Sequence, residues 1–173
     1  MREDRVLDRL AVLGVDTIPM LPCDRTRDLC ALIPERFHAL NLTREEDGVG
    51  SYTQATPIGL GLAVAMDKDI VVLDGDGSLL WTAVLPVVAA EAPENLTIVC
   101  LDNGAFGSTG NQPTPASGQV DMELLALAAG IRNMCKVQNE EELVEAWENW
   151  GQGPTFIHVV LRPGNAAAPN IPL

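Results

Sequence analysis

The stretch Ile70-Val71-Val72-Leu73-Asp74-Gly75-Asp76-Gly77-Ser78 decides the fold that we expect for this chain. Its first four residues are uninterrupted aliphatics, which is typical of a strand buried on both faces of a parallel sheet. The acidic and glycine residues that follow predict a turn into a helix over Leu79–Ala92, with a kink at Pro86. The segment Leu96–Leu101 (LTIVCL) then has the pattern of a second buried strand, so the centre of the chain predicts a strand–helix–strand unit.

Further elements are expected on both sides of this centre. The pattern predicts helices over 3–13, 28–33 and 55–66, strands over 15–21, 37–42 and 155–161, a helix from Asp121 to Ala129, and a helix opened by the capping pair Asn139 and Glu142. Strands that alternate with helices predict the α/β class, as a doubly wound, mostly parallel sheet with helices on both faces. We expect residues 1–162 to form one domain and residues 163–173 to form an irregular tail.

Composition limits the classes of partner. The 173 residues are 47% hydrophobic and include 24 acidic against 11 basic residues, for a net charge of −13, so we expect neither nucleic acid nor a membrane as partner. No apolar run reaches the roughly 20 residues of a membrane span, and the N-terminus has no signal-peptide core. The four cysteines, Cys23, Cys30, Cys100 and Cys135, have neither metal-binding nor scaffold spacing, which predicts reduced thiols in a cytoplasmic protein.

Polar clusters follow the two central strands at the point where each strand ends. One cluster is Gly75–Ser78 and the other is Asp102–Gly107. Neighbouring strands lie about 4.8 Å apart, so Asp76, expected on a loop, and Asn103 can reach one cation. Oxygen ligands of low total charge suit Mg²⁺, and Ser78 with the backbone N–H groups at the start of the helix over Leu79–Ala92 would face phosphates. Each cluster alone is a common turn, but together they predict a Mg²⁺–diphosphate site.

The spacing of these clusters resembles a known motif. Gly75-Asp76-Gly77, followed after 25 residues by Asn103, resembles the cofactor motif of the thiamine-diphosphate-dependent enzymes. The stretches Ile58–Ala63, Gly75–Leu80 and Leu101–Gln112 resemble the β subunits of the sulfopyruvate decarboxylase family, and the resemblance covers roughly residues 48–161. It implies a thiamine-diphosphate-binding fold of the pyrophosphate-binding (PP) type.

The resemblance also implies the site residues. By it, Asp76, Asn103 and the carbonyl of Ala105 bind Mg²⁺, and a loop over residues 108–112 faces the cofactor or substrate. The cofactor-binding set that it implies is Gly50, Ser51, Gly75, Asp76, Gly77, Ser78, Asn103, Ala105, Phe106 and Gly107. Thr53 departs from the family, which has a glycine at this position.

The activity that the resemblance implies is decarboxylation of a small anionic 2-oxo acid. The substrate would be 3-sulfopyruvate, giving sulfoacetaldehyde and CO₂ in coenzyme M biosynthesis, with thiamine diphosphate and Mg²⁺ as cofactors. A chain of this length has room for one domain, so we expect a pyrimidine-binding (PYR) α subunit, or a second copy of the chain, to complete the site. Residues 1–50 are partly PYR-like, and Thr43–Gly50 resembles the catalytic segment of the α subunit, which makes Glu46 a candidate catalytic residue beside its simpler interpretation as an acidic helix start.

Other interpretations remain open. A phosphonopyruvate decarboxylase subunit has a similar substrate, a flavodoxin-like or nucleotide-binding module would hold another phosphate at the same strand ends, and a regulatory subunit could keep the motif without turnover. Bound flavin would colour the purified protein yellow. His158 and His38 are interpreted as packed core residues, and Trp147 and Trp150 as core or subunit contacts.

Overall fold

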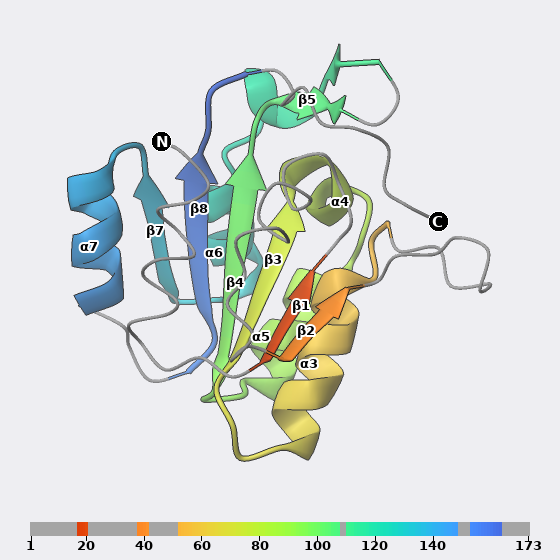
Figure 1. Cartoon of the computed structure of the whole chain (residues 1–173), viewed down its shortest axis with the longest axis vertical. Helices are drawn as coiled ribbons and strands as arrows, with labels where there is room; N and C mark the ends of the chain where they lie inside the picture. Colours follow the sequence, from red (N-terminus) through yellow and green to blue (C-terminus); the bar gives the residue numbers. More distant parts are fainter. Residues whose placement is uncertain (1–16, 21–37, 42–51, 108–109, 149–152, 164–173) are drawn as a thin grey trace.

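The computed structural model describes residues 17–20, 38–41, 52–107, 110–148 and 153–163 (Figure 1). Its elements in chain order are β1 (Thr17–Met20), β2 (His38–Asn41), α3 (Ala55–Ala65), β3 (Ile70–Gly75), α4 (Asp76–Leu80), α5 (Val84–Glu91), β4 (Leu96–Asp102), β5 (Ala105–Phe106), β6 (Gln112–Pro113), a 3₁₀ turn (Pro115–Ser117), α6 (Met122–Ala129), β7 (Asn133–Val137), α7 (Glu140–Glu148) and β8 (Thr155–Val160). The predicted helices over 3–13 and 28–33, the tail from 164 and Trp150 lie outside the described residues.

Six of the strands form one parallel sheet in the order β2-β1-β3-β4-β8-β7. β2 lies on one side of β1, and the next strand of this sheet along the chain, β3, lies on the other side. The boundary between β1 and β3 is therefore a topological switch point. Because all the strands of this sheet are parallel, their carboxyl ends lie at the same edge, below the small β5–β6 hairpin in Figure 1.

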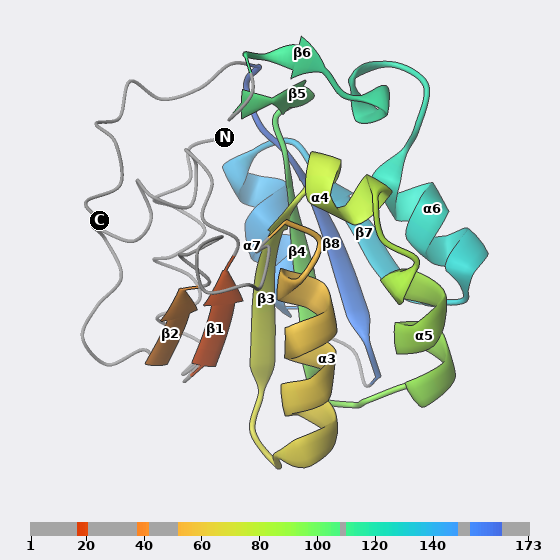
Figure 2. The ribbon, with the colours of Figure 1, turned by 90° about the vertical axis from the view of Figure 1, so that its right-hand side faces the viewer.

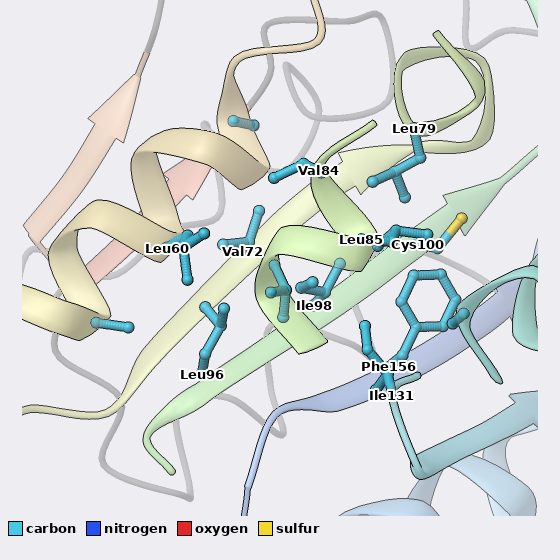
Figure 3. Close-up of a cluster of buried hydrophobic side chains, with 14 of the residues drawn as sticks. Leu60, Val72, Leu79, Val84, Leu85, Leu96, Ile98, Cys100, Ile131 and Phe156 are labelled. Carbon is cyan, nitrogen blue, oxygen red and sulfur yellow. The ribbon is translucent and has the colours of Figure 1, made fainter. Parts of the chain in front are cut away.

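Helices cover both faces of this sheet, as the sequence predicts. Figure 2 shows α3, α5 and α6 on one side, and α7 on the other. The main core lies between the sheet and the first group, where Val72, Ile98 and Phe156 pack against Leu60 and Leu85 (Figure 3). The central strands β3 and β4 are buried along almost their whole length, which explains their uninterrupted apolar sequences. No helix within the described part of the chain has the length and apolar character needed to cross a membrane.

The single helix predicted over Leu79–Ala92 is wrong in detail. The structure has two helices, α4 and α5, separated at Trp81–Ala83. Pro86 causes no kink, because it lies in the first turn of α5, where a helix residue has no intrahelical acceptor for its N–H. The helix instead begins earlier, at Asp76, and this moves the acidic residue of the motif from a loop into a helical turn.

Most of the other predicted ends are confirmed. Gly130 ends α6 in the left-handed conformation (φ 110°), and Asn139 caps α7 by accepting the backbone N–H of Glu142 at 2.9 Å. Asp121 stands at the start of α6 but makes no capping hydrogen bond with its side chain. The edge strand β7 was not predicted, because its sequence NMCKV lacks an apolar run. Cys100 and Cys135 are free thiols, as expected, whereas Cys23 and Cys30 lie outside the described residues.

Candidate metal and diphosphate site

The two polar clusters meet at the carboxyl edge of the sheet. Strands β3 and β4 are hydrogen-bonded neighbours with Gly75 paired to Leu101, so the turn into α4 and the loop after β4 are adjacent. Asp76 is the first residue of α4 and is 2% exposed, which corrects the prediction that it lies on an open loop. A change at Asp76 therefore acts on a buried group.

Burial controls the electrostatics of Asp76. The pKa of Asp76 is raised from 3.8 to about 6. Burial is the largest cause and the negative charge of Asp102 adds to it, whereas hydrogen bonds from the Thr114 hydroxyl and the backbone oppose the rise. The Thr114 hydroxyl donates to Asp76 Oδ2 at 2.5 Å. A buried carboxylate that faces another acid is costly to ionise, and a divalent cation would offset that cost.

The loop after β4 is held by its own hydrogen bonds. Asn103 Oδ1 accepts the N–H of Ala105 at 3.2 Å, and Asp102 Oδ1 accepts the N–H of Gly104 at 2.8 Å. Gly104 has a φ of +67°, a conformation that favours glycine in this turn. The backbone N–H of Thr114 donates to the Gly104 carbonyl at 3.0 Å, so Thr114 joins the Asn103 loop to Asp76.

The first turn of α4 is packed closely against aromatic groups. A Cβ at Gly77 would lie 2.8 Å from a Phe106 ring carbon and 2.8 Å from the Tyr52 hydroxyl, so a side chain at this position would require these groups to shift. The resemblance implies that Gly77 binds the cofactor, and in the structure these two side chains also approach it. Phe106 lies in β5 and is brought to α4 by the same loop that carries Asn103 and Ala105.

Thr53 contacts the first turn of α4 and has a strained backbone conformation. Its φ is +70°, which is unusual for a β-branched residue, and its N–H donates to the hydroxyl of Ser78 at 3.0 Å. The position where the resembled family has glycine thus keeps the glycine-like conformation. Ser78 lies within the first turn of α4 and is buried.

Asp74 stabilises the turn between β3 and α4 through hydrogen bonds. Its carboxylate is fully buried and accepts the Thr56 hydroxyl at 2.7 Å and the Gly75 N–H at 2.9 Å. Burial raises the pKa of Asp74, and the hydrogen bonds from Thr56, Ser78 and Gly75 oppose that rise. These contacts tie α3 to the end of β3 and fix the start of the motif.

The structure thus brings together most of the site residues named from the sequence: Gly75, Asp76, Gly77, Ser78, Asn103, Ala105, Phe106 and Gly107. Glu46, Gly50 and Ser51 lie outside the described residues. Sequence reasoning missed Thr114 and Tyr52, which contact Asp76 and Gly77. Nothing in the local pattern marks Thr114, because it reaches Asp76 from 38 positions away through the hairpin.

The donor set fits the expected ions. A carboxylate, an amide oxygen and a backbone carbonyl are all hard oxygen donors, which suit Mg²⁺ completed by water and phosphate oxygens. Within the residues that the structure describes there is no group of three His, Cys, Asp or Glu residues able to hold a metal. Fold and site together define a doubly wound α/β domain with a polar site at the carboxyl ends of β3 and β4.

Comparison with known proteins identifies the family of this domain. The family described as "Thiamine pyrophosphate enzyme, C-terminal TPP binding domain" matches residues 32–159, and the chain belongs to it. The chain is 48% identical over 127 residues to a sulfopyruvate decarboxylase of Methanosarcina acetivorans, covering 72% of this chain and 33% of that protein. It is 40% identical over 126 residues to a sulfopyruvate decarboxylase subunit beta of Methanothermobacter thermautotrophicus, covering 72% and 66%.

Two further comparisons bear on substrate and fold. A phosphonopyruvate decarboxylase of Streptomyces hygroscopicus is 42% identical over 123 residues, covering 69% of this chain and 30% of that protein. The structure of a thiamine diphosphate-dependent 4-hydroxybenzoylformate decarboxylase of Rhodococcus jostii RHA1 superposes with a TM-score of 0.73 at 16% identity, covering 97% of this chain and 33% of that one. The chain thus spans about a third of the length of the Methanosarcina and Streptomyces proteins. The superposition on the Rhodococcus structure confirms the α/β fold that the sequence predicts for this chain.

Proposed function

We propose that this chain is the diphosphate- and Mg²⁺-binding part of a thiamine-diphosphate-dependent 2-oxo acid decarboxylase. The observation that carries the proposal is the buried carboxylate of Asp76, linked through Thr114 to the loop of Asn103 and Ala105, in a domain of the thiamine pyrophosphate enzyme family. When bound, thiamine diphosphate supplies the electron sink for decarboxylation. The chain's own residues hold and orient the charged end of that cofactor.

The proposed roles divide by chemistry. Asp76, Asn103 and the Ala105 carbonyl would ligate Mg²⁺, which would relieve the charge repulsion between Asp76 and Asp102. Residues with small or hydroxyl side chains would face the diphosphate: Gly50, Ser51, Gly75, Gly77 and Ser78. Phe106 and Gly107 would line the same site from the β5 side.

The proposed substrate is 3-sulfopyruvate, which would yield sulfoacetaldehyde and CO₂ for coenzyme M biosynthesis. Two similar proteins named sulfopyruvate decarboxylase support this choice. The similarity to a phosphonopyruvate decarboxylase, at 42% identity, favours phosphonopyruvate as the second candidate. Both substrates are three-carbon 2-oxo acids with an anionic head group, so the two activities differ in the residues that contact that group.

We also propose that a PYR-type partner completes the active site. Two relatives support a site assembled from more than one domain. One is named as a subunit beta, and the other is three times as long as the segment that matches this chain. The partner is an α-type subunit or a second copy of this chain. Glu46 remains the candidate in this chain for the catalytic glutamate.

The test of this function combines binding with turnover. The full chain is titrated with thiamine diphosphate and Mg²⁺ by calorimetry, and both 2-oxo acids are then offered with and without a PYR-type α subunit. We expect Mg²⁺-dependent cofactor binding and turnover that requires the partner. A yellow, flavin-containing protein without affinity for thiamine diphosphate would contradict the proposal, and robust turnover by the chain alone would contradict the need for a partner.

A further inference from the structure

A buried histidine bridges two carboxylates beside the candidate site. His158 lies in β8 and is 2% exposed. Its Nε2 lies 2.7 Å from Asp102 Oδ2 in β4, and its Nδ1 lies 2.6 Å from Glu123 Oε2 in α6. We call Asp102, His158 and Glu123 the His158 bridge. The prediction that His158 is a hydrogen-bonded core residue is confirmed, but its two partners were not foreseen.

The geometry of the His158 bridge defines the charge of the ring. A neutral imidazole has one N–H, so a ring that donates hydrogen bonds to both carboxylates carries an N–H on each nitrogen, which is the imidazolium form. Burial alone would lower the pKa of His158, but the hydrogen bonds and charges of the two carboxylates outweigh it and raise the pKa. The hydrogen bond from His158 likewise holds the pKa of Glu123 below its usual value, against the effect of burial.

The inner end of the His158 bridge reaches the candidate metal loop. Asp102 uses Oδ2 for His158 and Oδ1 for the backbone N–H of Gly104, at 2.8 Å. Gly104 lies between Asn103 and Ala105, the two loop residues proposed as Mg²⁺ ligands. The orientation of the Asp102 carboxylate therefore sets the position of the turn that presents both ligands.

The outer end of the bridge reaches the protein surface. Glu123 Oε1 lies 3.1 Å from Lys136 Nζ, and Lys136 also pairs with the exposed Asp121 at 2.6 Å. The charges of Asp102, His158, Glu123 and Lys136 alternate in sign, so each buried charge has an opposite neighbour. The thiol of Cys100, paired in register with His158 in the sheet, also faces this cluster, where burial and the nearby acids raise its pKa.

We propose that His158 is a positioning residue for the metal-binding loop, which it fixes by holding the Asp102 carboxylate against the Gly104 N–H. This inference deepens the proposed function, on which it rests for the identity of the loop's ligand. It assigns a role in cofactor binding to a side chain that does not itself touch the cofactor. Groups that orient metal ligands in this way commonly change metal affinity about 10–100-fold when they are lost.

A purely structural role is the competing explanation. In that case the His158 bridge would only fasten α6 to the sheet through Glu123, and Asp102 would be incidental. Two variants separate these roles, because the amide of glutamine can occupy the place of Nε2 and the amide of asparagine the place of Nδ1. His158→Gln keeps the contact with Asp102, whereas His158→Asn keeps the contact with Glu123, and both remove the same charge.

The experiment uses the full chain labelled with ¹⁵N. NMR measures the protonation of the His158 ring and the amide resonance of Gly104, and calorimetry measures affinity for thiamine diphosphate with Mg²⁺. We expect a doubly protonated ring at pH 7, a Gly104 resonance that moves in His158→Asn but little in His158→Gln, and an affinity loss of about tenfold or more confined to His158→Asn. Lys136→Gln, at the surface end, is the matched control and should leave Gly104 in place.

Several results would overturn the proposal. A neutral His158 ring at pH 7, or a Gly104 resonance that responds equally to both variants, would reduce the His158 bridge to a structural contact. If His158→Asn does not fold, the wild-type chain gives the same answer, because its Gly104 resonance should follow the titration of the His158 ring, and independence of the two would refute the link. A wild-type chain that passes both NMR tests but binds no thiamine diphosphate would contradict the proposed function alone.

Discussion

Replacing Asp76 with asparagine should stabilise the metal-free protein while abolishing its response to metal. Burial raises the pKa of Asp76 from 3.8 to about 6, so the ionised carboxylate costs roughly two pKa units, or about 3 kcal/mol, of folding free energy at pH 8. Asparagine carries no charge and keeps one oxygen for the Thr114 hydroxyl. Loss of the second acceptor costs about 1 kcal/mol, which leaves an expected net gain of about 1–2 kcal/mol.

The pH dependence of this gain follows from the direction of the shift. Since the folded chain binds the Asp76 proton more tightly than the unfolded chain does, the contribution of Asp76 to metal-free stability falls as pH rises through the range from about 4 to about 6 and levels off above the folded-state pKa. The advantage of Asp76→Asn should therefore be present at pH 8 and absent at pH 4. Added Mg²⁺ and thiamine diphosphate should reverse the order, because a ligand at 100 times its Kd stabilises the wild type by about 2.7 kcal/mol.

Urea denaturation with EDTA, at pH 8 and pH 4, measures these differences. Asp69→Asn is the matched control, because Asp69 is exposed on the turn before β3. It should change neither the metal-free stability nor the metal response. A variant at Asp76 that is less stable than the wild type at pH 8 without metal, or that is still stabilised by Mg²⁺ and thiamine diphosphate, would refute the reasoning.

Three further changes have defined outcomes. Thr114→Val removes the hydroxyl that donates to Asp76 and should destabilise the chain by about 1–2 kcal/mol and weaken Mg²⁺ binding. Thr114→Ser keeps a hydroxyl and should retain the wild-type stability, measured by urea denaturation, and the wild-type Mg²⁺ affinity, measured by calorimetry. Gly77→Ala places a Cβ 2.8 Å from Phe106 and should cost about 1–3 kcal/mol by urea denaturation; unchanged stability would show that the ring moves freely. Thr53→Gly removes a β-branched side chain from a backbone with φ +70° and should stabilise the chain by about 1 kcal/mol, seen as a higher thermal midpoint. A lower midpoint would contradict the inference that the backbone at Thr53 is strained.

The strand pattern predicted the centre of the fold and the edge of the sheet at which the candidate residues lie. Buried parallel strands have continuous apolar sequences, and their carboxyl ends share one edge, so the adjacency of Asp76 and Asn103 followed from two short segments. The break at Trp81–Ala83 could not be predicted in the same way, because the residues on both sides of it are apolar and helix-compatible. The edge strand β7 also escaped prediction, since its NMCKV sequence has mixed polarity.

The contacts that organise the site depend on tertiary structure. Thr114 lies 38 positions from Asp76, and His158 lies 56 positions from Asp102, so no local spacing relates them. The burial of Asp76 escaped prediction for the same reason, because a residue that contacts its carboxylate, Thr114, is distant in the sequence. Sequence alone identifies candidate ligand types at strand ends, whereas their burial and hydrogen-bond partners come from chain packing.

The site assignment is tested most directly by locating the metal. Mn²⁺ can replace Mg²⁺ at oxygen-ligand sites and scatters anomalously, so a crystal of the chain with thiamine diphosphate and Mn²⁺, and with its PYR-type partner bound, would show the ion's position. We expect one anomalous peak within coordination distance of the Asp76 carboxylate, the Asn103 amide oxygen and the Ala105 carbonyl. Bound thiamine diphosphate with its metal ion at any other set of residues would contradict the assignment.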